Sequence, residues 1–282
     1  MKFGLSYNTG FYGTDPDQLI AVARHAEDCG FESFYVPEHI ALYVGATLYG
    51  TAIDPSVPIA DPLEILSFVA AATERILLGT GVLLVPYHHP VVLAKRLATI
   101  DVLSKGRMRL LTVGVGALPG EAEAAGVDFA SRGRRADEAI DVLRLLWSGD
   151  DTGVSFDGEF FSFTNLCSFP KPLDRLPIHV GGSSRPAARR AGLRGDGYFG
   201  GGRLTAQERA SHLDLMRATA RAAGRDADAL ECTRWGSIDM TGSDVDNFAA
   251  QGTTRLVVGP TSADLSEQRG QISEFAERLK LG

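Results

Sequence analysis

Short apolar runs alternate along this chain with longer segments in which apolar residues recur every three or four positions. The short runs predict β-strands and the periodic segments predict amphipathic helices. Strands are predicted at 2–7, 33–36, 76–85, 108–113, 177–180, 198–199, 232–240 and 255–258. Helices are predicted between and after them, at 16–29, 63–73, 91–103, 132–147, 185–191, 209–223, 245–251 and 265–279.

Strands that alternate with helices predict a parallel sheet, either closed into a barrel or open and doubly wound. Several of the strands are apolar on both faces, as a sheet covered by helices requires. The first strand-to-helix turn, NTGFYG at 8–13, lacks the G-x-G-x-x-G spacing of an open dinucleotide-binding sheet. The sequence therefore predicts an α/β fold, a (β/α)8 TIM barrel, with residues 1–282 in a single domain.

Two stretches depart from the repeat. Residues 39–61 show no periodicity, and a loop of this length is typical of a functional lid or a mobile segment. Residues 153–176 predict a hairpin inserted before the fifth strand, with Asp157-Gly158 as the turn between 154–156 and 159–161. We expect this hairpin to cover part of the barrel.

Composition narrows the class of protein. The chain has 282 residues, 44% of them hydrophobic, and a net charge of −7, which argues against nucleic acid or an anionic membrane as partner. Cys29, Cys167 and Cys232 are odd in number and far apart, which indicates a reducing compartment. No apolar stretch is long enough for a membrane span, and the N-terminus does not resemble a signal peptide. We expect a soluble, cytoplasmic protein that binds a small-molecule substrate.

Function in such a barrel lies in the loops that follow the strands. His39, in the Pro37-Glu38-His39 turn after the second strand, could bond a cofactor or transfer a proton, although its local pattern favours an exposed loop histidine. Gly79 and Gly81 interrupt the third strand, where glycine marks a bulge or a close ligand. Tight packing explains these two glycines equally well.

The run GGSSRP at 181–186 follows the fifth strand. Its glycines permit a tight turn and a serine can cap the next helix, whose N-terminus suits a phosphate. A plain strand-to-helix turn is the alternative. A second glycine run at 200–202 follows the sixth strand and could complete the same phosphate-binding site.

Two adjacent histidines, His88 and His89, follow the third strand in the run YHHP. No further ligand follows at metal-binding spacing, so this turn predicts a pocket wall and no metal site. The sequence contains no G-x-S-x-G elbow or Ser-His-Asp pattern of a hydrolase.

An ordered set of stretches resembles the luciferase-like monooxygenase family, in particular its compact oxidoreductases that use the deazaflavin coenzyme F-420. The set comprises CGFESFYVPEH at 29–39, ILLGTGV at 76–82, DVLSKGR at 101–107, RGRR at 132–135 with LLW at 145–147, FPKP at 169–172 and PIHVGG at 177–182. Each stretch is weak alone, but the order is specific and spans most of the chain.

The resemblance implies roles that the residues alone do not show. Glu38 and His39 would lie at the cofactor ring, with His39 as the catalytic proton-transfer group. Gly81 and Val82 would form a non-proline cis peptide that supports the ring. The cofactor phosphate would be bound by Gly181, Gly182, Ser183 and Ser184, with Gly200 nearby. The resemblance also implies a homodimer, and Phe11, Tyr43, Tyr49 and Tyr87 are expected to line the substrate space.

The expected reaction is hydride transfer between coenzyme F-420 and a small organic substrate. Family members that oxidise sugar phosphates carry a catalytic Glu after the fourth strand; here that loop reads GVGALPG at 114–120, with Glu121 and Glu123 only later, which argues against that substrate. The nearest alternative is an FMN-dependent monooxygenase that uses O2 and flavin reduced by a partner reductase. A non-catalytic flavin-binding protein is the alternative of another class.

Overall fold

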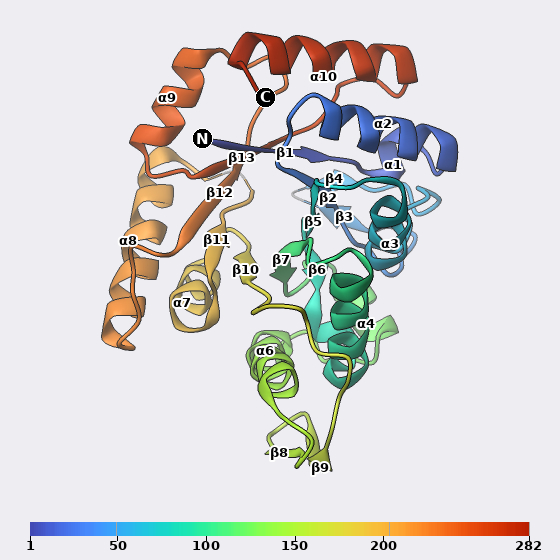
Figure 1. Cartoon of the computed structure of the whole chain (residues 1–282). Coiled ribbons are helices and arrows are strands. Elements are labelled where there is room, and N and C mark those ends of the chain that lie inside the picture. Colours follow the sequence, from blue (N-terminus) through green and yellow to red (C-terminus); the bar gives the residue numbers. More distant parts are fainter. Residues whose placement is uncertain (49, 203, 282) are drawn as a thin grey trace.

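The computed structural model describes residues 1–48, 50–202 and 204–281, and its main sheet closes into a parallel barrel (Figure 1). Within these residues each barrel strand pairs with the next, and β13 pairs with β1 to complete the ring. The predicted TIM barrel is confirmed. Its strands are β1 (Lys2–Ser6), β2 (Ser33–Val36), β5 (Leu77–Thr80), β7 (Met108–Gly114), β10 (Ile178–Gly181), β11 (Gly197–Phe199), β12 (Glu231–Trp235) and β13 (Arg255–Val258).

The third and seventh predicted strands were too long. The strand predicted at 76–85 is divided into β5 and β6 (Leu83–Leu84), because the peptide between Gly81 and Val82 is cis and interrupts the pairing with β7. The strand predicted at 232–240 ends at Trp235, where Gly236 begins a turn that leads to the next helix.

Long helices surround the barrel (Figure 1). Side-chain caps define several of their first turns: Asp15 accepts from Gln18 N, Asp61 accepts from Leu63 N, and Thr205 and Thr241 form capping boxes. The helices are α2 (Pro16–Asp28), α3 (Pro62–Ala72), α4 (Pro90–Leu103), α6 (Arg132–Ser148), α7 (Arg185–Arg194), α8 (Ala206–Ala222), α9 (Gly242–Ala250) and α10 (Leu265–Leu279). The predicted starts of α2 and α3 were within one residue of those observed, whereas α8 and α9 begin three residues before the predicted 209 and 245.

Shorter elements lie in the loops at the carboxyl ends of the strands, and none of them was predicted. They are α1 (Thr9–Tyr12), α5 (Pro119–Ala124), the 3-10 turn η1 (Val85–Tyr87) and the antiparallel pair β3 (Thr47–Leu48) and β4 (Thr51–Ala52) within the loop 39–61. Each is too short to show a hydrophobic period. No helix in the described part of the chain is long and apolar enough to cross a membrane.

The inserted hairpin is confirmed, but its turn is longer than predicted. Strand β8 (Val154–Asp157) pairs antiparallel with β9 (Ser162–Leu166), which begins at Ser162 and not at Glu159. Residues 158–161 form the turn because the carboxylate of Glu138 accepts hydrogen bonds from the amides of Phe160 and Phe161. The hairpin lies beyond α6, on the outside of the barrel (Figure 1).

An ionic cluster closes the amino-terminal end of the barrel. The guanidinium of Arg255, only 1% exposed, bonds Glu32 at 2.6 Å and Glu231 at 2.7 Å. Burial opposes ionisation of Glu231, but the hydrogen bond and charge of Arg255 lower the pKa of Glu231 to about 2. This end of the barrel is therefore filled by paired charges, and the loops at the other end remain for function.

Candidate active site

His39 and Glu121 form a hydrogen-bonded pair at the mouth of the barrel. Nδ1 of His39 lies 3.1 Å from Oε2 of Glu121, and Oε1 of Glu121 accepts the backbone N–H of Ile40 at 2.7 Å. The Glu121 side chain is fully buried, whereas the imidazole is 23% exposed. His39 is thus held through Nδ1 and remains partly exposed, as a proton-transfer group requires.

Glu38, the residue before His39, forms a second pair of the same type. Its Oε1 lies 2.8 Å from Nε2 of His88, and its Oε2 accepts the backbone N–H of Leu84 at 2.5 Å. This carboxylate therefore joins the end of β2 to β6 and η1. His88 was predicted as a pocket wall and is found as the partner of Glu38. Among the described residues, no three His, Cys, Asp or Glu side chains gather as a metal site would require.

The predicted cis peptide is present between Gly81 and Val82. The Val82 side chain occupies the space beside two glycines at the ends of neighbouring strands. A methyl group on Gly114 or on Gly181 would lie 2.5 Å from a Val82 methyl carbon, which is far inside van der Waals contact. Gly181 is therefore needed for packing against Val82, whatever its part in binding a phosphate.

Trp235 is a candidate site residue that sequence reasoning missed. It ends β12 next to the barrel mouth, is 43% exposed, and packs on the buried ring of Phe199 with centroids 4.8 Å apart. A methyl group on Gly81 would lie 3.7 Å from the Trp235 ring, so the two residues are neighbours. Its position at the end of a barrel strand could have indicated a site residue. The predicted strand ran to 240, however, so Trp235 was placed in its interior.

The loop after β10 has the backbone of an anion site. Gly182 has φ +129°, a conformation that favours glycine, and its carbonyl accepts the Tyr198 hydroxyl at 2.7 Å. Ser184 caps α7 by accepting from Ala187 N at 3.3 Å, while the Ser183 hydroxyl bonds no other described residue. The first turn of α7 carries no acid and begins with Arg185, so its charge and dipole suit a phosphate.

Two of the predicted lining aromatics pack against the segment that carries Glu121. Tyr43 lies over Gly120, and Tyr87 lies over Gly116, where added methyl groups would collide with the rings. The Tyr87 hydroxyl is buried without a partner among the described residues, and burial raises the pKa of Tyr87 to about 12. Phe11 is exposed and packs edge-on against Tyr12. Tyr49 lies outside the described residues.

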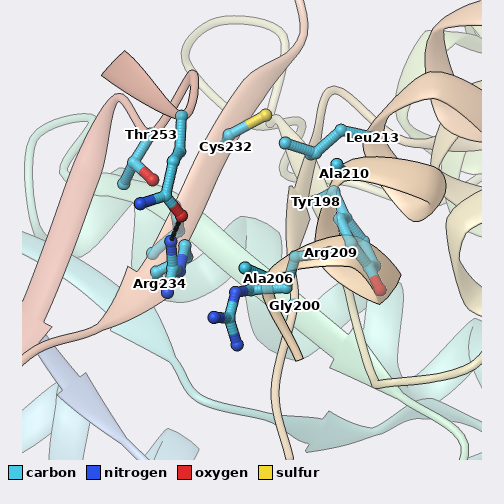
Figure 2. A pocket seen from close by; sticks show the side chains of 11 residues that line it. Tyr198, Gly200, Ala206, Arg209, Ala210, Leu213, Cys232, Arg234 and Thr253 are labelled. Atoms are coloured by element: carbon cyan, nitrogen blue, oxygen red, sulfur yellow. Dashed lines mark hydrogen bonds between the residues drawn. The ribbon is translucent and has the colours of Figure 1, made fainter. Parts of the chain in front are cut away.

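A separate cavity of about 110 Å³ lies between α8 and the strands β11 and β12 (Figure 2). Arg234 bonds Gln251 at its edge, and burial together with the charge of Arg209 lowers the pKa of Arg234 to about 10. Of the predicted site residues only Gly200 lines this cavity. Cofactor binding by Gly200 stays a prediction.

Comparison with known proteins agrees with this geometry. The sequence model of a family described as luciferase-like monooxygenase matches residues 1–241. The chain belongs to the luciferase-like monooxygenase family. It is therefore an enzyme of the luciferase-like type, and the resemblance inferred from the ordered stretches is confirmed.

Its relatives include proteins with and without a named activity. An uncharacterized protein, Rv0953c of Mycobacterium tuberculosis, is 36% identical over 189 residues, which cover 64% of this luciferase-like chain and 65% of the relative's length. An F420-dependent glucose-6-phosphate dehydrogenase of Microbacterium testaceum is 29% identical, over 71% of this chain and 56% of the relative. The fold resembles that of an F420-dependent secondary alcohol dehydrogenase solved with an F420-acetone adduct, with a TM-score of 0.82. The two chains are 19% identical, and the match covers 99% of this chain and 98% of that one.

Proposed function

We propose that this enzyme transfers a hydride between coenzyme F-420 and a small alcohol or the corresponding carbonyl compound. The observation that carries the proposal is the position of His39. Its imidazole is partly exposed at the barrel mouth and is held by a buried carboxylate. The segment that bears it is also bonded to the first residue of the cis peptide, because Gly81 N donates to the carbonyl of Val36 at 2.9 Å. Names of relatives and of structural neighbours support the same cofactor.

The residues present fit such a cofactor. Gly182 and the capped, acid-free start of α7 suit its phosphate, and the exposed ring of Trp235 offers a flat apolar surface beside Gly81. When bound, the deazaflavin would accept or supply the hydride, since cofactors carry the redox chemistry. The protein would hold the phosphate with residues 181–184, support the ring at Gly81 and Val82, and exchange the substrate proton at His39.

A sugar phosphate is not the proposed substrate, although a relative is named for one. The loop 114–120 carries no acidic side chain, and Glu121, the first acid after it, is fully buried and bonded to His39 and Ile40. The remaining aromatic surroundings, Tyr43 and Tyr87, favour a small and weakly polar molecule.

Titration of the purified protein with F-420 and, separately, with FMN tests the proposal, with fluorescence as the readout. We expect F-420 to bind more tightly, and Ser183→Asp to weaken binding at least tenfold by placing a negative charge where the phosphate would lie. Ser148→Asp, at the exposed last residue of α6 and away from the loop 181–184 in sequence, is the matched control and should leave affinity unchanged. Binding of neither cofactor would overturn the proposal.

Two rival functions give other outcomes. An FMN-dependent monooxygenase, which the family's description supports, would prefer FMN and would need a reductase partner. A non-catalytic flavin-binding protein would bind the cofactor, leave its redox state unchanged with any alcohol or ketone, and be indifferent to His39→Ala. The expected homodimer remains a proposal that sedimentation analysis tests.

A further inference from the structure

We infer that Glu121 fixes the tautomer of His39, so that Nε2 is the bare nitrogen that receives the substrate proton. Glu121 is thus a positioning residue that acts through His39, and the inference rests on the proposed role of His39. It draws on two contacts of one buried carboxylate, and neither contact can be recognised from the sequence.

The backbone amide of Ile40 determines how the carboxylate is used. This N–H can only donate, and Oε1 of Glu121 accepts it at 2.7 Å. The other oxygen, Oε2, faces Nδ1 of His39 at 3.1 Å. An ionised carboxylate has no proton to give, so Nδ1 must carry the hydrogen of this bond. In the neutral imidazole the proton is then absent from Nε2.

Nε2 has no hydrogen-bond partner in the described part of the chain, and the side chain is 23% exposed. In alcohol oxidation, the O–H proton of the substrate would pass to Nε2. The carbinol C–H bond would break with its electron pair leaving as hydride to the oxidised cofactor, and the C=O bond would form. The imidazolium would lie against the Glu121 carboxylate, which balances its charge. The reverse steps reduce a carbonyl compound.

Glu121→Gln tests this because the Ile40 amide also determines the orientation of a glutamine. The Gln oxygen must face Ile40 N–H, since the NH2 group there would oppose two donors. The NH2 group therefore faces Nδ1 of His39, which becomes an acceptor, and the imidazole proton moves to Nε2. The substitution is isosteric, and it removes the bare nitrogen from the mouth without emptying the space that Glu121 fills.

The readout is the nitrogen-15 NMR spectrum of histidine-labelled protein without cofactor, with the His39 signals assigned by their loss in His39→Gln. We expect the Nδ1–H tautomer in the wild-type protein and the Nε2–H tautomer in Glu121→Gln. We also expect Glu121→Gln to lower kcat for alcohol oxidation by about 10²–10⁴-fold, the usual contribution of a positioned base. Affinity for F-420 should change by less than about threefold, because Glu121 makes no contact with the proposed phosphate site.

Two variants serve as matched controls. Glu123→Gln alters an exposed carboxylate on the same short helix and should leave both the tautomer and kcat unchanged. Glu38→Gln repeats the design at the other pair and should switch the tautomer of His88 but not that of His39.

An Nε2–H tautomer in wild-type His39 would overturn the inference without any variant. Full activity of Glu121→Gln with a switched tautomer would also overturn it. Failure of the proposed function would give a different result from these two. F-420 would not bind, or His39→Ala would retain activity, although the NMR spectra would still show the expected tautomers.

Discussion

Glu38 and His88 are joined by a hydrogen bond of 2.8 Å from Nε2 to Oε1, and the other oxygen of this carboxylate accepts the amide of Leu84. Glu121 and His39 repeat the arrangement, again with one backbone N–H on the second oxygen. Two adjacent residues thus have different roles: Glu38 is the carboxylate of the pair with His88, and His39 is the imidazole of the pair with Glu121. The two pairs connect β2, β6, η1 and α5 around the barrel mouth.

The first prediction concerns the contribution of Glu38 to the stability of the fold. Its side chain is 3% exposed, so Glu38→Ala leaves the Leu84 N–H without an acceptor in a buried place. We expect a loss of about 1–3 kcal/mol in the free energy of unfolding, measured by urea denaturation. Glu123→Ala, at an exposed position, should stay within about 0.5 kcal/mol of the wild type. Equal stability of the two variants would contradict this account.

The second prediction concerns Val82 and Gly181. Gly181→Ala brings a methyl group to 2.5 Å from Val82 Cγ1, and a valine has little freedom to move away. We expect Gly181→Ala to destabilise the protein by about 1–3 kcal/mol. Val82→Ala should remove most of that penalty in the double variant, giving a coupling energy of at least about 0.5 kcal/mol. Additive free energies of unfolding would show that the two side chains do not compete for this space.

Much of the fold could be predicted because its signals are local. The strands at 33–36 and 255–258 and the helix at 265–279 have the predicted bounds, and the helix starts follow from capping residues adjacent to them. The order of strands and helices was enough to indicate a parallel barrel. Gly81, Val82 and the loop 181–184 could be recognised from runs of a few residues.

The site residues that the sequence did not predict depend on contacts between segments far apart in the chain. Glu121 lies 82 positions after His39, on a six-residue helix that shows no period of its own. Tyr43 packs over the neighbouring Gly120, a contact between distant segments that nothing near either residue indicates. Trp235 was missed because the strand was predicted to continue to 240, whereas β12 ends at Trp235 and Gly236 begins a turn.

The third prediction is a pH dependence of stability caused by His179, on β10. Burial, with the charge of Arg255, lowers the pKa of His179 to about 4, against about 6.5 for an unfolded histidine. The unfolded chain therefore binds a proton that the folded one excludes as the pH falls from 6.5 towards 4. Stability is greatest above pH 6.5 and should drop by about 2 kcal/mol between pH 7 and pH 5 from this group alone.

Urea denaturation of the wild type and His179→Gln at pH 7 and pH 5 measures this effect. The variant should be less stable at pH 7 but should lose the part of the pH dependence that His179 causes. His89→Gln, at an exposed position, is the control that should keep the wild-type slope. An unchanged slope in His179→Gln would mean that His179 is protonated to the same extent in both states.

The fourth prediction uses the two tryptophans of the chain to locate the cofactor. Trp235 is exposed at the barrel mouth, whereas Trp147 lies on α6 and donates its indole N–H to the carbonyl of Ala94. A cofactor ring seated beside Gly81 would contact Trp235 only. We therefore expect F-420 to quench tryptophan emission in the wild type and in Trp147→Phe, but not in Trp235→Phe.

Affinity gives an independent measure of the same contact. Stacking between aromatic rings contributes about 0.5–1.5 kcal/mol beyond the area it buries, so Trp235→Ala should weaken F-420 binding by about tenfold. Trp235→Phe should retain most of the affinity while losing the quenching, because a smaller ring still covers the cofactor. If Trp235→Ala binds as tightly as the wild type, the ring lies elsewhere in the mouth, and the phosphate loop at 181–184 would have to orient it differently.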